Sequence, residues 1–410
     1  MTQPMTQPMT QPTTQPLPQP LSGIRVVDLT RVLSGPFSTM LLADMGADVV
    51  KIETPQGDTV RAQGDTARGM SWYFAAFNRN KRSVVIDLRR DEGKAVLAKL
   101  IAGADVLVEN FRPGVLAEMG FTEARLNELN PRLIVGSVNG YGSTGPYVDR
   151  PAFDFIAQAM SGFMATTGEP GGAPMRAGPP VTDLIAGLYC AFGIVNALRA
   201  RDLTGQGQRV EAAMVNGMVS MLAYLASEYF ATGKAPDRTG NDHPIASPYG
   251  LFKTATGDIA VAPATAEIMQ KLFTAIGAPD VPGNPDYKTT EQRRARRAEL
   301  NALVNARLMS NTQDYWIAKL NAAGVPAGKV LTVPELFDDP QIKAQDMVLD
   351  VEHPGQGNVR MVGFPVKLSG TPCAVRHPAP ELGAHTAEVL AEIGMGAAEV
   401  ATLKAAKVVG

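Results

Sequence analysis

The feature of this sequence that most restricts its fold is a regular alternation of short apolar runs with amphipathic segments, which begins near residue 21. Strands that alternate with helices form parallel βαβ units, in which helices cover the faces of the sheet. The pattern therefore predicts an α/β fold with a Rossmann-like large domain. The expected strands are 24–29, 47–53, 83–88, 105–109 and 133–137, and the helices between them are 37–46, 91–101 and 122–130.

The loop after the first expected strand reads TRVLSGP. It lacks the GxGxxG pattern that shapes a pyrophosphate site, which removes the best support for a nicotinamide or flavin enzyme. The sequence has no P-loop either. Because one α/β fold serves many chemistries, the function has to be argued from other residues.

The later part of the chain changes character, and its length of 410 residues predicts two domains. A helix expected over 184–200 is apolar on nearly every side, so we expect it in a core or an interface. A smaller domain is expected over about 240–330. The other expected elements are a helix at 215–232, a hairpin at 250–262, and helices at 266–277, 291–309 and near 382–395.

The first 20 residues form a Thr-Gln-Pro repeat with almost no apolar content. Such a segment cannot bury enough surface to offset the entropy of ordering, so we expect disorder. A polyproline ligand for a partner is the alternative. The repeat lacks the basic start and the apolar stretch of a signal peptide.

Charge and cysteine content indicate the compartment. A net charge of −2 and a pI of about 6.2 give no sign of binding to nucleic acid or to an anionic membrane. The two cysteines, Cys190 and Cys373, fit a reduced cytoplasmic protein. We see no run of about 18 apolar residues and expect no membrane span. No histidine spacing suggests a metal site.

Asp183 is the candidate catalytic residue. It stands in GPPVTDLIAGLYCAF, where a Gly/Pro-rich loop runs into the long apolar helix. Aspartate is a favoured helix N-cap, which is one interpretation. The helix dipole and free N–H groups would also hold its carboxylate ionised. An ionised carboxylate can attack a thioester carbonyl and form a mixed anhydride, so the structural and catalytic interpretations are compatible.

Three further segments carry a family resemblance. They read NRNKRSVVIDLRRDEGKAVL, ADVLVENFRPGVLAEMGF and VNGYGSTGPYVDRPAFDFIAQAMSG. Together with the Asp183 stretch, they resemble the class III CoA-transferases, a family that also contains the α-methylacyl-CoA racemases. The resemblance covers nearly everything from about Leu21 to the C-terminus. It implies that Asp183 is the catalytic nucleophile and that Asp154 hydrogen-bonds it, although sequence alone favours a structural hydrogen bond for Asp154.

The resemblance also implies a domain plan. Both chain ends form the large domain, the middle forms a small α+β domain, and two chains thread through each other as an interlocked homodimer. The expected boundaries are 21–215 for the first part of the large domain, 216–239 for a connecting helix and linker, 240–330 for the small domain, and 331–410 for the return linker and the rest of the large domain.

Positions that meet substrate in the family can be carried onto this sequence one by one. Taken alone, the charged ones among them are more often solvated surface residues. Lys81 and Arg82 are expected to supply cations near the CoA phosphates. The CoA-binding matches are Val32, Ile86, Asp87, Leu88, Arg89, Asn110, Phe111 and Arg112. The acyl-end matches are Leu33, Ser34, Tyr73, Phe153 and His243, of which His243 is otherwise a turn residue. The other histidines, His353, His377 and His385, are expected at the surface or in turns.

Phe153 discriminates between branches of the family. The racemase branch carries a histidine at this position, and that histidine forms an acid/base pair with the aspartate that matches Asp183. Phenylalanine cannot exchange a proton, so the transferase branch is favoured. The chain also departs from formyl-CoA transferases, which have glutamine at the position of Leu33 and basic residues at those of Thr54, Glu118 and Pro151. These departures leave the CoA phosphate contacts open.

The sequence therefore predicts a CoA-transferase that exchanges CoA between an acyl-CoA and a free carboxylic acid, with CoA thioesters as substrates and no metal or redox cofactor required. The stretch HPIASPYGLFKTATGDIAV is similar to dicarboxylate-handling members, which favours succinyl-CoA and a second dicarboxylate. The alternatives are an α-methylacyl-CoA racemase with a rearranged base and a non-catalytic acyl-CoA-binding protein.

Overall fold

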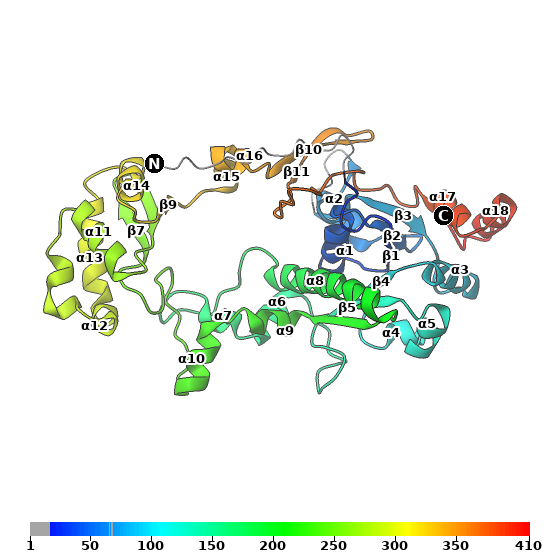
Figure 1. The fold of residues 1–410 in the computed structure, drawn as a ribbon, viewed down its shortest axis with the longest axis horizontal. Coiled ribbons are helices and arrows are strands. Elements are labelled where there is room, and N and C mark those ends of the chain that lie inside the picture. The colour runs from blue at the N-terminus through cyan, green and yellow to red at the C-terminus, as the bar shows by residue number, and fades with distance from the viewer. Residues whose placement is uncertain (1–16, 65, 67–68) are drawn as a thin grey trace, which may run out of the picture. The chain divides into compact units, whose positions relative to one another are not determined.

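The computed structural model describes residues 17–64, 66 and 69–410, so the predicted disorder of the repeat falls almost wholly outside the described residues. Contacts between Cα atoms divide the chain into two compact units (Figure 1). Of the described residues, the first unit holds 17–64, 66, 69–157, 180–221 and 345–410, and the second holds 158–179 and 222–344. The chain therefore leaves the first unit and returns to it twice.

A six-stranded parallel sheet forms the centre of the first unit, which confirms the predicted α/β class. Its order is β3-β2-β1-β4-β5-β6, so the direction of strand addition reverses between β1 and β4. The strands are β1 (Arg25–Asp28), β2 (Asp48–Glu53), β3 (Lys81–Val85), β4 (Val106–Glu109), β5 (Ile134–Asn139) and β6 (Arg209–Ala213).

Helices bury both faces of this sheet. Val26 packs in the core that includes α1 and α8, whereas its neighbour Val27 packs in the core that includes α3 and the C-terminal helices. Successive side chains of a strand point to opposite faces, so this division follows from the apolar runs that predicted the strands. The helices of the unit are α1 (Ser34–Asp44), α2 (Trp72–Asn78), α3 (Asp91–Ala102), α4 (Val115–Glu118), α5 (Glu123–Leu129), α8 (Val181–Thr204), α9 (Met214–Ser220), α17 (Thr386–Glu392) and α18 (Ala397–Ala405).

The end of the chain adds to the first unit. The N–H of Asp87 donates to the carbonyl oxygen of Val408 at 2.8 Å, so the last residues lie beside the segment that follows β3. A hairpin of β10 (Val348–His353) and β11 (Gly357–Val362) comes before the two C-terminal helices, α17 and α18. His353 is only 2% exposed, so a surface position for it is wrong, but it begins the hairpin turn, where its carbonyl oxygen accepts from the N–H of Gln356 at 3.0 Å. A hairpin strand buries alternate side chains, and His353 is one of them.

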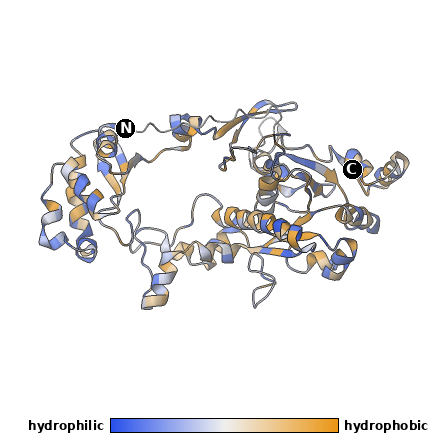
Figure 2. Ribbon diagram, in the orientation of Figure 1, coloured by the Kyte–Doolittle hydropathy of each residue, from blue (hydrophilic) through white to orange (hydrophobic). Residues whose placement is uncertain are grey.

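By length and composition α8 could cross a membrane, which differs from the expectation that no segment of the chain could. In the structure it packs against α1, β5 and β6, and Ala186, Cys190 and Ile194 are buried. A core helix of a soluble protein passes the same test of length and composition. The apolar composition of α8 is visible in Figure 2.

The second unit contains a three-stranded antiparallel sheet, β7 (Gly250–Thr254), β8 (Gly257–Val261) and β9 (Ala327–Lys329), in the order β7-β8-β9. The first two strands confirm the hairpin predicted at 250–262. Its own core is built from the sheet and the surrounding helices. These and the remaining helices of the unit are α7 (Phe163–Thr166), α10 (Tyr224–Thr232), α11 (Ala266–Ala275), α12 (Thr290–Ala295), α13 (Arg297–Leu308), α14 (Gln313–Ala322), α15 (Val333–Asp338) and α16 (Pro340–Ala344).

Two predicted helices are each divided in the structure. The segment expected as one helix over 215–232 forms α9 and α10, because Ala223 has a φ of 47°. A positive φ interrupts a right-handed helix, and an alanine gives no sequence signal for it. The segment expected over 291–309 forms α12 and α13, which meet at Arg296.

Candidate active site

The loops at the carboxyl ends of the central strands are anchored by the strands themselves. Each of four strands ends in a buried polar side chain that accepts a hydrogen bond from an N–H group in the following loop. A buried acceptor that is satisfied in this way fixes the direction in which the chain leaves the sheet. The four pairs are Asp28 with Thr30, Glu53 with Asp58, Glu109 with Phe111, and Asn139 with Gly142.

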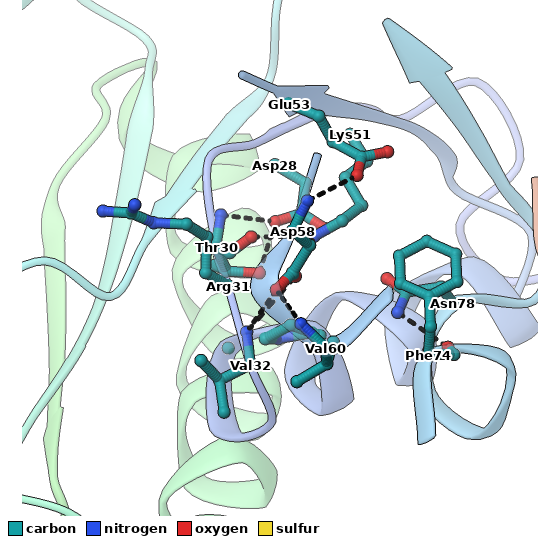
Figure 3. A network of polar contacts seen from close by, with 12 residues as sticks. Asp28, Thr30, Arg31, Val32, Lys51, Glu53, Asp58, Val60, Phe74 and Asn78 are labelled. Atoms are coloured by element: carbon teal, nitrogen blue, oxygen red, sulfur yellow. Dashed lines mark hydrogen bonds and ion pairs between the residues drawn. The ribbon is translucent and has the colours of Figure 1, made fainter. Parts of the chain in front are cut away.

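The loop between β1 and α1 has additional support from a buried ion pair (Figure 3). The ammonium of Lys51 lies 3.1 Å from a carboxylate oxygen of Asp58, and both side chains are completely buried. Lys51 also donates to the carbonyl oxygen of Thr30 at 2.8 Å. Asp58 accepts from the N–H of Val32 at 3.2 Å. Val32 has a φ of 70°, which is unfavourable for a β-branched residue, so these contacts hold a strained turn.

A second buried lysine supports the start of α1. The ammonium of Lys81 donates to Asp28 at 3.1 Å and to the carbonyl oxygen of Pro36 at 2.9 Å. Burial lowers the pKa of Lys81 to about 8, although Asp28 opposes this shift. For Asp28, burial favours a higher pKa, but the charges of Lys81 and Lys51 hold the pKa below its usual value.

The expectation that Lys81 and Arg82 offer open cations to a phosphate is therefore wrong. Lys81 is buried and paired with Asp28. Arg82 pairs with Asp48 at 2.7 Å and with Glu392 at 2.6 Å. The sequence shows these residues as consecutive charges at a strand start, and only the fold reveals their partners.

Asp183 lies in the first turn of α8 but does not cap it. The helix begins at Val181 with Pro180 at the N-cap position, so the N-cap interpretation of Asp183 is wrong. Asp154, the first residue of α6 (Asp154–Met160), instead accepts from the N–H of Thr182 at 2.9 Å and from its hydroxyl at 2.8 Å. A neighbouring segment therefore supplies the acceptor for an N–H group at the start of α8.

The surroundings of Asp183 raise its pKa to about 7. Burial is the main cause, the negative charge of Asp154 adds to it, and a hydrogen bond from Ser34 acts in the opposite direction. A carboxyl group with this pKa is ionised in about half of the molecules at pH 7, so the expectation that the helix start holds this carboxylate ionised is wrong, because burial outweighs it. Burial and the charge of Asp183 also raise the pKa of Tyr73, so this predicted acyl-end residue lies within electrostatic range of the same carboxylate.

The predicted contact residues gather around two cavities that share lining residues. The first cavity has a volume of about 450 Å³ and contains Asp183, whereas the second has a volume of about 260 Å³. Predicted residues in the first are Val32, Leu33, Ser34, Asn110, Phe111, Arg112, Phe153 and Asp183. Predicted residues in the second are Ile86, Asp87, Leu88, Arg89 and Phe111. The two cavities meet at the loops after β1 and β4, where the strand order reverses, which is the usual ligand position in open α/β sheets.

Two of the residues predicted to contact the substrate lie outside these linings, as does Asp154. Tyr73 packs against a small apolar cluster with Val32. His243 belongs to the second unit, where its Nδ1 accepts from the N–H groups of Ile245 and Ala246 at 3.1 and 3.0 Å. Its ring also stacks on Tyr224.

Sequence reasoning missed the polar residues that end the strands, the buried pair of Lys51 and Asp58, and two cavity arginines, Arg31 and Arg150. The available signal for the strand-end residues was an acidic or amide side chain at the end of an apolar strand. Within the described ranges, no group of three or more His, Cys, Asp or Glu residues could hold a metal ion.

Comparisons with known proteins agree with this picture. The family model for CoA-transferase family III matches residues 21–386. A succinate–glutarate CoA-transferase from Agrobacterium fabrum is 38% identical, over 91% of this chain and 95% of that protein. A succinyl-CoA:glutarate CoA-transferase from Homo sapiens is 35% identical, over 91% and 86%. The crystal structure of a CAIB/BAIF family protein from Brucella suis superposes with a TM-score of 0.82 at 38% identity, covering 92% of this chain and all of that one.

Proposed function

The chain belongs to CoA-transferase family III, and from this premise we propose that it moves CoA from an acyl-CoA to a free carboxylic acid with Asp183 as the nucleophile. The observation that carries the proposal is the Asp183 carboxyl group, which lines a cavity of about 450 Å³ beside the loops at the strand ends. Its pKa of about 7 provides a basic carboxylate that is still ionised in a useful fraction of molecules.

The first half of the reaction transfers the acyl group and then CoA to the enzyme. A carboxylate oxygen of Asp183 attacks the carbonyl carbon of the donor thioester, the carbon–sulfur bond breaks, and CoA leaves as a thiolate. The product on the enzyme is a mixed anhydride. The thiolate then attacks the aspartyl carbonyl carbon, which releases the donor acid as a carboxylate and leaves an aspartyl-CoA thioester.

The second half runs in the opposite sense with the acceptor acid. The acceptor carboxylate attacks the aspartyl carbonyl carbon, expels the CoA thiolate, and forms a second mixed anhydride. The thiolate attacks the acceptor's carbonyl carbon, and the new acyl-CoA leaves as the Asp183 carboxylate is restored. No oxidant, reductant or net proton is consumed in this cycle.

The first turn of α1 provides suitable donors for the oxyanions of these steps. The first N–H groups of an α-helix have no acceptor within the helix, and the helix dipole adds partial positive charge there. We propose that N–H groups near Leu33 and Ser34, which line the cavity with Asp183, stabilise each tetrahedral intermediate. Asp154 is proposed to hold the first turn of α8 through Thr182 and to keep the pKa of Asp183 high through its charge.

For the substrates, we propose succinyl-CoA as donor and a second dicarboxylic acid as acceptor. Support comes from relatives named for succinate, glutarate and citramalate, which match more than nine-tenths of this chain. A racemase would need a second acid/base group, and Phe153 stands in the cavity, 71% exposed, where that group would be expected.

We also propose a cytoplasmic, interlocked homodimer with a Rossmann-like large domain. The strand order supports the domain class. Exposed apolar side chains on α8, with Leu188 at 54% and Phe192 at 66%, support an interface on that helix. Native mass spectrometry would give twice the chain mass, and a monomeric mass would contradict the dimer.

A CoA-exchange assay tests the central proposal. Purified protein is incubated with succinyl-CoA and a mixture of carboxylic acids, and all CoA thioesters are measured by mass spectrometry. We expect new thioesters with the wild type and none with Asp183→Ala. Trapping with hydroxylamine should convert Asp183 to a hydroxamate. Full exchange by Asp183→Ala would exclude this mechanism, and CoA binding without exchange by the wild type would favour a binding protein.

A further inference from the structure

The cavity that contains Asp183 carries an excess of positive charge. Arg31, Arg112 and Arg150 line it, and Asp183 is the one acidic residue among its described lining residues. No ion pair joins any of these arginines to another residue in the described part of the chain. Three unpaired guanidinium groups around one acidic nucleophile, in a chain of net charge −2, indicate that the ligand itself is an anion.

Two of these arginines are oriented by aromatic rings. The guanidinium carbon of Arg150 lies 3.7 Å from the centre of the Tyr147 ring, and that of Arg31 lies 5.2 Å from the centre of the Phe111 ring. A guanidinium that stacks on a ring still has its N–H groups available at its edge. Figure 3 shows the Arg31 side chain directed away from the buried pair of Lys51 and Asp58. All three arginines are exposed, so they lie at the solvent side of the cavity.

The second cavity differs in its electrostatics. Arg89 is bound at both ends of its guanidinium by Asp87, at 2.8 and 2.9 Å, and Lys51 is paired with Asp58. The charges lining this cavity are therefore already compensated within the protein, apart from Arg31, which lines both cavities together with Phe111. Such a site suits an uncharged or aromatic portion of a ligand, whereas the first cavity suits its anionic portion.

We propose that Arg31, Arg112 and Arg150 bind the diphosphate of the CoA thioester and so hold the substrate in the cavity that contains Asp183. This inference rests on the proposed function. The diphosphate joins the nucleoside of CoA to the arm that carries the thioester, and Arg31 stands where the two cavities meet. Arginine forks match phosphate oxygens in pairs, and three such groups compensate the charge of a diphosphate. The distal carboxylate of a dicarboxylic substrate has the same kind of charge, so the experiment separates the two sources.

The test compares a full and a truncated substrate. Arg150→Gln and Arg31→Gln are each assayed with succinyl-CoA and with succinyl-pantetheine, which lacks the phosphates. We expect each variant to raise KM for succinyl-CoA about tenfold while kcat changes less than about twofold, because binding is lost equally in ground and transition states. With succinyl-pantetheine, each variant should match the wild type in kcat/KM. The KM of Arg150→Lys for succinyl-CoA should lie between those of the wild type and Arg150→Gln, since lysine keeps the charge but not the paired N–H donors of arginine.

Arg125→Gln is the matched control, because Arg125 is an exposed arginine on α5 that lines neither cavity. Arg125→Gln should leave kcat and KM unchanged with both succinyl-CoA and succinyl-pantetheine. If the Arg31 and Arg150 variants lost kcat/KM equally with both thioesters, or lost none with either, the proposal would be overturned. Butyryl-CoA forms a third arm: a loss confined to succinyl-CoA would assign the arginines to the distal carboxylate and would also overturn it.

A binding measurement keeps this inference separate from the proposed function. Isothermal titration of free CoA needs no catalysis, and we expect Arg150→Gln to weaken CoA binding about tenfold and to reduce its dependence on salt. If the wild type binds CoA in this arginine-dependent way but performs no exchange, the proposed function fails and the inference stands. If exchange occurs and neither KM nor CoA affinity changes in the variants, the inference fails alone.

Discussion

The backbone of Ser34 lies directly against Gly187: a Cβ atom on Gly187 would be 2.5 Å from the Ser34 carbonyl oxygen. Gly187 follows Asp183 by about one turn of α8, so the missing side chain lets the start of α1 approach the helix that carries the proposed nucleophile. Ser34 can then hydrogen-bond Asp183 from the neighbouring helix. The close approach of two helices thus positions a polar pair.

Gly187→Ala should therefore impair both folding and activity. The new methyl group would clash with a backbone atom, which cannot move aside as a flexible side chain can. We expect the free energy of unfolding to fall by about 1–3 kcal/mol and the exchange rate to fall at least tenfold. Gly396→Ala is the control, because a Cβ there would meet nothing within 4 Å. Urea unfolding curves give the stability, and the CoA-exchange assay gives the rate. A Gly187→Ala variant that exchanges CoA at the wild-type rate would contradict this role.

The pH dependence of kcat/KM should report the titration of Asp183. Because the ionised carboxylate is the proposed nucleophile, kcat/KM should rise with pH through a limb near pH 7. Asp154→Asn keeps an oxygen for Thr182 but removes a charge that raises the pKa of Asp183, so the limb should move to lower pH. Ser34→Ala removes a hydrogen bond that lowers the pKa, so the limb should move to higher pH. Shifts of both variants in the same direction would contradict the assignment.

Asp183 should also reduce stability at neutral and alkaline pH. Its pKa in the folded protein is about 7, above the value of an unfolded chain. Its contribution to stability is therefore fully present below the unfolded-state pKa of about 4 and is lost progressively as the pH rises from there to the folded-state pKa of about 7. Asp183→Asn avoids the loss because it stays neutral. We expect it to increase the free energy of unfolding by roughly 2 kcal/mol at pH 8 and by less at pH 5, measured by urea denaturation. An equal effect at both pH values would count against the raised pKa.

The buried pair of Lys51 and Asp58 gives a fourth prediction. Lys51→Met leaves Asp58 buried with its charge partly uncompensated, so the free energy of unfolding should fall by about 3–5 kcal/mol. The turn at Val32 should also loosen, with a loss of exchange activity. Lys51→Met combined with Asp58→Asn removes both charges and should recover part of the stability. If the double variant were as unstable as the sum of the two single variants, the pair would not be coupled.

The sheet was predictable because its signal is local. Each central strand is a short apolar run, and the structure places all five predicted strands within three residues of their expected bounds. The break at Ala223 was not predictable, because nothing in the residue type indicates a positive φ. The split at Arg296 likewise has no glycine or proline to mark it.

The candidate site was predictable only in part. Asp183 stands out at the junction of a loop and a long helix, but the N-cap interpretation failed because the helix begins two residues earlier. The burial of Lys81 depends on Asp28, which is 53 residues away in the chain, and no local pattern reports such a partner. Arg150 is one surface arginine among many until the fold brings it to the cavity with Arg31 and Arg112.

The polar residues that end β1, β2, β4 and β5 separate the sheet, which supports the site, from the loops, which line it. Each loop is fastened to its own strand by a buried acceptor, and the loop after β1 is held in addition by contacts from Lys51, Asp58 and Asn110. Substrate range could therefore diverge by insertion or exchange in the parts of the loops beyond these contacts, while the scaffold that carries Asp183 is inherited unchanged. A laboratory search for new acyl specificity can begin with the same rule: vary the loops and leave these anchors untouched.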